Sequence, residues 1–371
     1  AVLLTPELLN KINTLVVSAG HKLIKKKEEI KTRCDSFVVE TNVHYPTDSN
    51  LLFDATRKAV ELTAQLCSKL KIPGWRQNKS LVLKCKNMLH AIQNLRHSTS
   101  TNEEKKARRT QELKKQHADY VNYSVQLISK VVAQVETLNK FNLLPIGYNT
   151  KEIEMYIEYA KLFQDQIRRR VLDGKKIPHD EKVFSVFEPH TEWVVKGKAG
   201  VRQELGVRVC VVTDTFGFTV HHHVMEKETD SEVAVKVMRS AVEQFPNITS
   251  CSFDKGFWSP QNKEALESFL KITALPKKGR LSKADKLHQY SEDFRKAQKG
   301  HSAVESAINA HENHGLDMCP DKGIRGFKSY ISLAVLARNI QHLGTLLIKK
   351  ETRSRLHSKA IKRGLRQRLA A

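Results

Sequence analysis

The sequence predicts an α/β protein whose mixed sheet, flanked by helices, is interrupted by a large all-helical insert. Three observations support this fold class. Residues 34–43 carry the apolar and β-branched pattern of a strand. Residues 50–173 then show helical periodicity almost throughout. From about residue 180, short β-rich segments return and are followed by helices. The first strand is therefore separated from the rest of its sheet by the helical region.

Composition points to a polyanionic partner. The 371 residues include 63 Lys and Arg against 40 Asp and Glu, which gives a net charge of +23. Nucleic acid is the first partner that such an excess suggests, an anionic membrane is the second, and a merely soluble basic protein is the plain alternative. No apolar run approaches the ~18 residues that span a bilayer, so we expect no membrane segment. The six cysteines form no CxxC, which favours reduced thiols in a cytosolic protein.

The N-terminal segment predicts a helix over residues 5–29, with Thr5 as N-cap and Pro6 in the first turn. It has no basic leader and no cleavage signature, so we expect no signal peptide. The chain does not begin with Met, and we expect the rest of an N-terminal DNA-binding region to lie upstream of it. The strand at 34–43 ends in a Pro-containing break.

The insert is predicted to hold four helices, and Asp48 is expected to cap the first of them. Their predicted ranges are 50–71, 79–98, 101–140 and 150–172. Charges of both signs mix along the third helix, which is typical of a solvated face or a helical hairpin. Trp75 in the insert and Trp258 further on are expected to pack in a core or, less commonly, to stack on an unpaired base.

The C-terminal half predicts the remaining elements. Strands are predicted at 183–189, 191–198, 205–214, 217–225, 247–254 and within 271–281. Helices are predicted at 230–244, 283–298, 301–313 and 326–348. The last 23 residues hold nine Lys or Arg and one acid, and they form either a DNA-tracking arm or a frayed basic end. Without the insert, this order is that of a mixed sheet of about five strands flanked by helices, which matches the ribonuclease H-like fold.

Three acids lie where such a fold gathers carboxylates at neighbouring strand ends. Asp35 heads the first predicted strand, and a charge among apolar residues is unfavourable unless a partner or a metal compensates it. Asp254 ends an apolar strand before Lys255-Gly256, and the glycine is expected to let the chain turn away. Glu305 lies among apolar helix residues, so we place it on or beside the buried face. The plainer interpretations are a strand-edge acid, a turn-forming Asp and a solvated helix acid.

Carboxylates at such positions suit metal-assisted phosphodiester chemistry. Two Mg²⁺ ions about 3.5–4 Å apart clamp the attacking and leaving oxygens, and hard cations bind carboxylate oxygens. Other polar residues have simpler explanations. Asp214 is expected to cap a strand end, and Thr229 or Asp230 is expected to cap the helix that begins at residue 230. The histidines at 221–223 lie on one strand, where neighbours face opposite ways, so we expect solvated side chains rather than one chelating group.

Five segments, in this order, resemble the DDE transposases of bacterial insertion sequences. They are DSFVVETNVHYPTDSNLLFDA, SVFEPHTEWVVKGK, SFDKGFWSPQN, HSAVESAINAHENHGLD and FKSYISLAVLARNIQHLG, between about residues 31 and 346. One motif such as DKGF is weak, whereas five in order are specific. The resemblance implies that Asp35, Asp254 and Glu305 are the catalytic, metal-binding triad, with Mg²⁺ or Mn²⁺ as cofactor.

The sequence departs from this resemblance at two points. The insert follows the first acid, whereas relatives more often carry one after the second. Many relatives surround the glutamate with Tyr, Arg, Glu and Lys, and the matching positions here hold Gln298, His301, Glu305 and Glu312. Glu312 is therefore a rival to Glu305, and the Arg contact to phosphate falls to His301 or to other bases. The residues expected to contact DNA, with solubility as the alternative, are Lys196, Lys198, Arg202, Lys255, Lys277, Lys278, Arg280 and His301.

The resemblance implies a transposase with four parts. They are an N-terminal helical segment at 1–30, a ribonuclease H-like catalytic domain at 31–49 and 180–346, a helical insert at 50–179 and a basic tail at 347–371. The implied function is Mg²⁺-dependent cleavage at insertion-sequence ends and strand transfer into target DNA. A homodimer would act on double-stranded DNA (terminal inverted repeats and target) in the bacterial cytoplasm, at the nucleoid. The alternatives are a metal-dependent nuclease without strand transfer, a non-catalytic DNA-binding relic and a structural helical protein.

Overall fold

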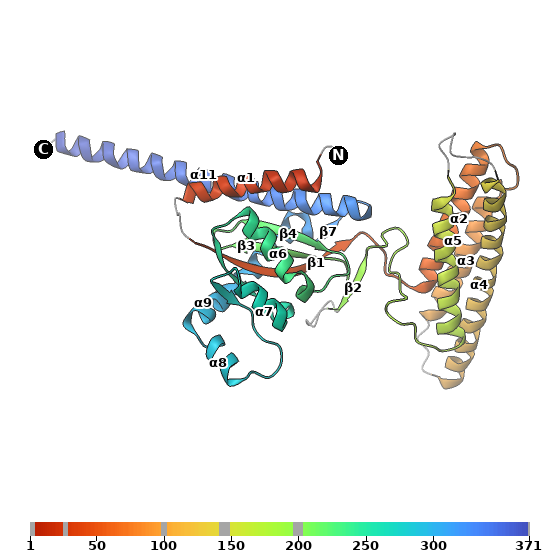
Figure 1. The fold of residues 1–371 in the computed structure, drawn as a ribbon. Helices are drawn as coiled ribbons and strands as arrows, with labels where there is room; N and C mark the ends of the chain where they lie inside the picture. Colours follow the sequence, from red (N-terminus) through yellow and green to blue (C-terminus); the bar gives the residue numbers. More distant parts are fainter. Residues whose placement is uncertain (1–3, 25–28, 98–101, 141–148, 196–202, 370–371) are drawn as a thin grey trace. The chain divides into compact units, whose positions relative to one another are not determined.

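The computed structural model describes residues 4–24, 29–97, 102–140, 149–195 and 203–369 (Figure 1). The chain divides into two compact units. The sheet unit consists of Ala1–Asn42 with His190–Ala371, and the helical unit is Val43–Pro189. Each unit has its own hydrophobic core.

The sheet unit contains a mixed sheet, as the sequence predicts for an α/β protein. Its strands are β1 (Ile30–Thr41), β2 (Glu192–Val195), β3 (Gln203–Asp214), β4 (Thr219–Met225), β5 (Ile248–Phe253), β6 (Ile272–Ala274) and β7 (Met318–Cys319). The order β3-β1-β5-β6 runs through the sheet, with β2 and β4 each pairing with β3 and β7 pairing with the end of β1. Strand β3 is antiparallel to β1, whereas β5 and β6 are parallel to it. Because β1 is central, Asp35 lies beside the neighbouring strand β5.

Two predicted strands differ from the observed ones. Strand β1 begins at Ile30 rather than at 34, because residues 30–34 find partners on β5, so Asp35 lies in the middle of the strand and not at its head. Residues 183–189 form no strand. The hydroxyl of Ser185 accepts hydrogen bonds from the backbone N–H groups of Phe187 and Glu188, which fixes a turn there instead.

The two faces of the sheet pack against different helices. Alternation along β1 puts Phe37 and Val39 on one face, where they join a core with Phe327 and Ile331 of α11 (Gly323–Leu369). Cys34 faces the other way, into a core formed with α6 (Asp230–Gln244). Asp35 therefore points to the α11 face, and Ser36 points to the α6 face.

The sheet unit contains further helices around this sheet. They are α1 (Pro6–Ile24), α7 (Pro260–Glu267), α8 (Lys283–Gln289), α9 (Glu292–His301) and α10 (Ala303–His311), with a 3₁₀ turn at Lys255–Phe257 and a π-helical turn at Glu312–Leu316. The single helix predicted at 283–298 is interrupted at Tyr290 and Ser291, and Ser291 is the N-cap residue of α9. Helix α1 lies alongside α11 (Figure 1), and the amide of Asn339 donates to Asn13 across that contact.

Helix α11 is longer than the predicted 326–348 helix, because the backbone of the basic tail continues it to Leu369. By length and hydropathy alone, Gly323–Leu356 could cross a membrane, which the sequence analysis did not expect. Core helices pass the same test, and this one packs Phe327, Ile331 and Val335 against the sheet. It is therefore weak evidence for a membrane segment.

The helical unit contains the four helices that the sequence predicts. They are α2 (Asp48–Lys69), α3 (Asn78–Arg96), α4 (Glu103–Asn139) and α5 (Lys151–Ile167), the last continued by a π-helical turn at Arg168–Leu172. The cap of α2 is Thr47, whose hydroxyl accepts from Asn50 N, and not Asp48, which pairs with Arg170. Trp75 is buried in the core of this unit, so stacking on a DNA base is ruled out for it in this fold.

Candidate active site

The register of β1 and β5 places two of the predicted catalytic acids side by side. The strands are parallel, and Cys34 lies opposite Phe253, the last residue of β5. The next residues along the two chains are Asp35 and Asp254. Since neighbouring strands lie about 4.8 Å apart, the backbones of these residues start from adjacent positions. Asp35 remains inside β1, whereas Asp254 leaves the sheet at the start of the 3₁₀ turn and is exposed.

Gly256, two residues after Asp254, lies close to the carboxylate of Asp230. A Cβ atom on Gly256 would lie 2.8 Å from Oδ2 of Asp230. The glycine is therefore needed for space, rather than for the sharp turn that the sequence suggested, since its φ is not positive. Asp230 itself is not the cap of α6, because Thr229 and Glu232 form a capping box there. Of the two predicted caps of this helix, Thr229 is confirmed and Asp230 is not.

Glu305 reaches the same place from α10. Its neighbour Val304 is buried, and Ile308, one turn further on, packs against the core on the Asp35 face of the sheet. Glu305 itself is exposed, so of its two predicted places, on or beside the buried face, only the place beside that face agrees with the structure. It lines a cavity of about 480 Å³ together with Asp35 and Asp254. This cavity brings together all three acids that the sequence singled out.

The rival acid and the predicted phosphate contact lie in the same cavity. Glu312 and His301 are both among its lining residues. The ring Nδ1 of His301 lies 3.1 Å from the hydroxyl of Ser252 on β5. Burial lowers the pKa of His301, although Asp254 and Glu305 act against this shift. The imidazole is thus neutral at pH 7, a hydrogen-bonding group rather than a cation.

The electrostatics of the cavity centre on Asp35. Burial, and after it the carboxylates of Asp254, Asp230 and Glu305, together raise the pKa of Asp35 to about 6, against the hydrogen bond that Ser36 N donates to Asp35. No basic side chain of the described residues is among the causes that shift the pKa of Asp35. A raised carboxylate pKa in a cavity is typical of a functional site.

Asp230 is a fourth acid near this cavity that sequence reasoning set aside. The hydroxyl of Ser36 donates to Asp230 Oδ1 at 2.6 Å, on the α6 face of the sheet. Ser36 also donates its N–H to Asp35 at 2.8 Å, so it links the two carboxylates. The only sequence signal was an acid opening a helix, which capping explains equally well. The link depends on tertiary packing.

The predicted DNA-contacting residues differ in their surroundings. Lys255 and Arg280 are exposed, and Lys278 Nζ donates to the carbonyl of Gly256 at 3.1 Å, close to Asp254. Lys277 forms an ion pair with Asp285 at 2.5 Å. Lys196, Lys198 and Arg202 lie outside the described residues. Contact with DNA stays a prediction for all of them.

The histidine run and Asp214 have structural roles. His222 is buried and lies 3.0 Å from the hydroxyl of Ser332, so the expected solvated side chain was wrong at this position. Burial lowers its pKa to about 3, which keeps the ring neutral. His221 and His223 face α6 instead, as alternation along β4 requires. Asp214 accepts backbone hydrogen bonds in the β3–β4 turn and one from His21.

The cavity suits a divalent cation by its chemistry. Its acids offer hard carboxylate oxygens, the ligands that Mg²⁺ and Mn²⁺ prefer. The mutual repulsion that raises the Asp35 pKa would be relieved by a cation between these groups. Among the described residues, no three His, Cys, Asp or Glu side chains already stand in a metal-holding arrangement. The fit of the cavity residues to the ion thus rests on donor type and charge alone.

Comparison with known proteins supplies the family. Residues 164–340 match the family model described as a transposase DDE domain. This span includes Asp254 and Glu305, whereas Asp35 precedes it. No curated protein and no solved structure matches the chain. The chain thus carries a transposase DDE domain over residues 164–340, and such a domain implies polynucleotidyl transferase activity.

Proposed function

We propose that this protein cleaves DNA at the ends of an insertion sequence and joins the freed end to target DNA, with Asp35, Asp254 and Glu305 as its metal-binding triad. The observation that carries the proposal is the shared cavity, in which acids from β1, from the end of β5 and from α10 meet. Those elements are far apart in the sequence. Their convergence is difficult to explain by capping or solvation, because three such acids repel one another.

The strand order supports a ribonuclease H-like fold for the catalytic domain. The DDE domain implies this fold. The order β4-β3-β1-β5-β6, with only β3 antiparallel to its neighbours β1 and β4, puts β1 in the centre. Asp35 and Asp254 then lie at the gap where β5 ends and β1 continues. The fold therefore delivers two carboxylates from rigid elements before any substrate arrives.

Each acid has a distinct task in this proposal. When bound, divalent cations would supply activation of the attacking hydroxyl and stabilisation of the leaving oxygen. Asp35 holds its carboxylate in the sheet, where Ser36 N orients it. Asp254 and Glu305 approach from exposed positions and remain accessible to a DNA strand. No covalent link between protein and DNA is required, so no Ser or Tyr nucleophile is invoked.

The partners follow from the same chemistry. Double-stranded DNA, as terminal inverted repeats and as target, matches the net charge of +23. We propose that a homodimer pairs the two ends of the element. We also propose that the protein acts in the bacterial cytoplasm without a membrane.

A strand-transfer assay tests this function against a nuclease of the same fold. The full chain, Mg²⁺ and pre-cut ends of its own element are incubated with a supercoiled plasmid. The proposal predicts joined products that carry the element end, and none with Asp254→Asn. Plasmid nicking without joined products would mean that the protein is a nuclease without strand transfer. No Mg²⁺-dependent product at all would mean that it is a DNA-binding relic.

A further inference from the structure

The helical unit contains a long stretch of one charge sign. Between Glu61 and Glu103 the sequence has no Asp or Glu. The same stretch has seven basic residues, which are Lys69, Lys71, Arg76, Lys79, Lys84, Lys86 and Arg96. It covers the end of α2, the following turn and all of α3. An unbalanced basic surface of this kind attracts polyanions.

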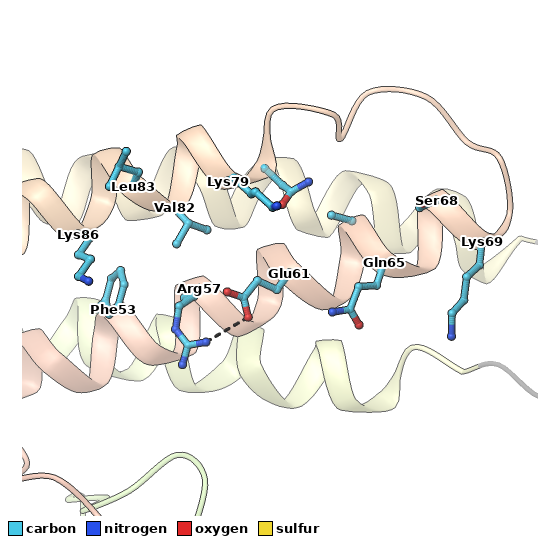
Figure 2. A pocket seen from close by; sticks show the side chains of 12 residues that line it. Phe53, Arg57, Glu61, Gln65, Ser68, Lys69, Lys79, Val82, Leu83 and Lys86 are labelled. Carbon is cyan, nitrogen blue, oxygen red and sulfur yellow. Dashed lines mark hydrogen bonds and ion pairs between the residues drawn. The ribbon is translucent and has the colours of Figure 1, made fainter.

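A groove lies between α2 and α3 along this stretch (Figure 2). Its volume is about 870 Å³. Lys79 and Lys86 line it from α3, and Lys69 lines it from α2. Glu61 is the one acid among the lining residues, and Arg57 pairs with it at 3.1 Å. When the Arg57–Glu61 ion pair is set aside, all the other charged residues that line the groove are basic.

Lys79 and Lys86 are placed to meet a linear anion. Both are exposed, and they are seven residues apart, which is two helical turns or about 10.5 Å along α3. Helix α3 contains no acid, so neither lysine has a carboxylate three or four residues away to pair with. Arg57 is different, because it also lies against the rings of Phe53 and Phe187.

The beginning of α3 adds to the positive potential of the groove. Its N-cap residue, Gln77, makes no side-chain cap hydrogen bond, and the first turn has no acid. The positive end of the helix dipole is therefore not balanced locally. Asn78 lies at this end and, with Gln65 and Ser68 of α2, supplies neutral hydrogen-bond donors to the groove. Side chains of these types are, with Arg and Lys, among those that donate hydrogen bonds to DNA phosphates.

We propose that the α2–α3 groove binds the phosphate backbone of duplex DNA, as a second DNA-binding surface besides the acidic cavity. The lining residues of α2 run from Phe53 to Lys69, about 24 Å along the helix. A trough of that length suits a strand of phosphates better than a small anion. The inference rests on the proposed function, and it gives the helical unit a task that the catalytic chemistry does not.

DNA-binding titrations of the full chain test the groove. A random-sequence duplex of about 40 base pairs is used in EDTA, which prevents cleavage, over a series of salt concentrations. The Lys79→Gln/Lys86→Gln variant is compared with Lys114→Gln/Lys115→Gln, which removes the same charge from exposed positions of α4 outside the groove. Lys79→Arg/Lys86→Arg keeps the charge. Thermal unfolding checks that all variants are folded.

The proposal predicts weaker binding and a shallower salt dependence for Lys79→Gln/Lys86→Gln alone. The slope of log affinity against log salt should fall by about 2, since each lost phosphate contact removes about 0.9. The Arg variant should match the wild type. Equal slopes and affinities for the two Gln variants would contradict DNA binding by the groove. If the wild type still performs strand transfer in that case, the proposed function is not affected. Absence of DNA binding by the wild type would instead reject both.

Discussion

At the scale of single residues, Asp35 is the most informative position. It is a carboxylate inside a central strand, followed on the same face by the apolar Phe37, and burial together with three further acids raises its pKa. No basic side chain compensates it through a hydrogen bond among the described residues; its described partner is Ser36 N. Such an arrangement opposes folding, which is expected where binding a cation is the function.

Replacing Asp35 by Asn should therefore stabilise the metal-free protein. The substitution removes a poorly compensated charge while keeping the shape of the side chain. We expect the unfolding midpoint at pH 7.5 in EDTA to rise by a few degrees, corresponding to about 1–2 kcal/mol. Differential scanning calorimetry measures it. A lower midpoint would show that the carboxylate is already well compensated.

The gain should depend on pH in a defined direction. The folded pKa of Asp35 is about 6, above the value of about 3.9 in an unfolded chain, so the folded protein binds this proton more tightly. The wild type should lose stability relative to Asp35→Asn as the pH rises from about 4 to about 6. Above that range the difference should stay constant. Midpoints measured from pH 4 to pH 8 for both proteins check this, and a pH-independent difference would contradict it.

Mg²⁺ or Mn²⁺ should reverse the order of the two proteins. Because protons and cations compete for Asp35, stabilisation of the wild type by added metal should be full above pH 7 and decline as the pH falls through about 6. Asp35→Asn should gain much less from the metal at any pH. Thermal shift at several metal concentrations is the measurement. Equal shifts in the two proteins would place the metal elsewhere.

The sequence predicted part of this site for clear reasons. Asp254 and Glu305 follow patterns that are local, an acid at a strand end and an acid on an amphipathic helix. The link from Ser36 to Asp230 could not be predicted, because it depends on α6 packing over β1. The exposure of Glu305 was missed for the same kind of reason, since helical periodicity does not say which part of a face meets a cavity.

At the scale of elements, the close pairing of β1 with β3 depends on the small size of Gly206. Gly206 pairs with Glu40 of β1 on one side and with Glu192 of β2 on the other. A Cβ atom here would lie 2.1 Å from the carbonyl oxygen of Val39. That atom belongs to the backbone of the strand that carries Asp35. It cannot move away as a flexible side chain would.

Gly206→Ala should therefore lower the free energy of unfolding of the sheet unit by about 1–3 kcal/mol, because the added methyl group displaces β1 from β3. The control is Gly300→Ala in α9, where no atom lies within 4 Å of the added Cβ. There the change should be neutral or stabilising by up to about 1 kcal/mol, because Ala favours helix over Gly. Chemical denaturation compares the two. A harmless Gly206→Ala would mean that β1 and β3 are further apart than described.

Elements with strong local signals were predicted closely, and those that depend on tertiary partners were not. Helix α6 matches its predicted range because Thr229 and Glu232 form a capping box. The start of β1 was missed because Lys31 and Arg33 look like loop residues until β5 pairs with them. Residues 183–189 have the composition of a strand, but Ser185 fixes a turn and Val186 packs into the helical core.

At the scale of the whole molecule, the net charge and the division into two units underlie the proposed binding of DNA. The excess of basic residues was visible in the composition, and so was the helical interruption of the sheet. The groove of the helical unit was not, because its lysines face a common trough only after α2 and α3 pack together. The continuation of α11 through the basic tail was likewise not predicted.

Binding of the full chain to duplex DNA should depend steeply on salt. With six or more phosphate contacts, affinity should fall by about 10³-fold or more between 50 and 200 mM salt. Fluorescence anisotropy with a labelled duplex in EDTA measures the slope. A slope near zero would show that the net charge of +23 serves solubility and not DNA binding.

The central claim is that Asp35, Asp254 and Glu305 form one catalytic centre. Its most direct test is DNA cleavage by the full chain with Mg²⁺ or Mn²⁺, on plasmid DNA that carries the ends of its own element. Asp35→Asn, Asp254→Asn and Glu305→Gln should each reduce the cleavage rate by at least about 10³-fold, because each removes a metal ligand. All three should still bind DNA in EDTA. Glu312→Gln, from the same cavity, should cleave at close to the wild-type rate. Loss of cleavage in Glu312→Gln together with normal cleavage in Glu305→Gln would contradict the triad proposed here.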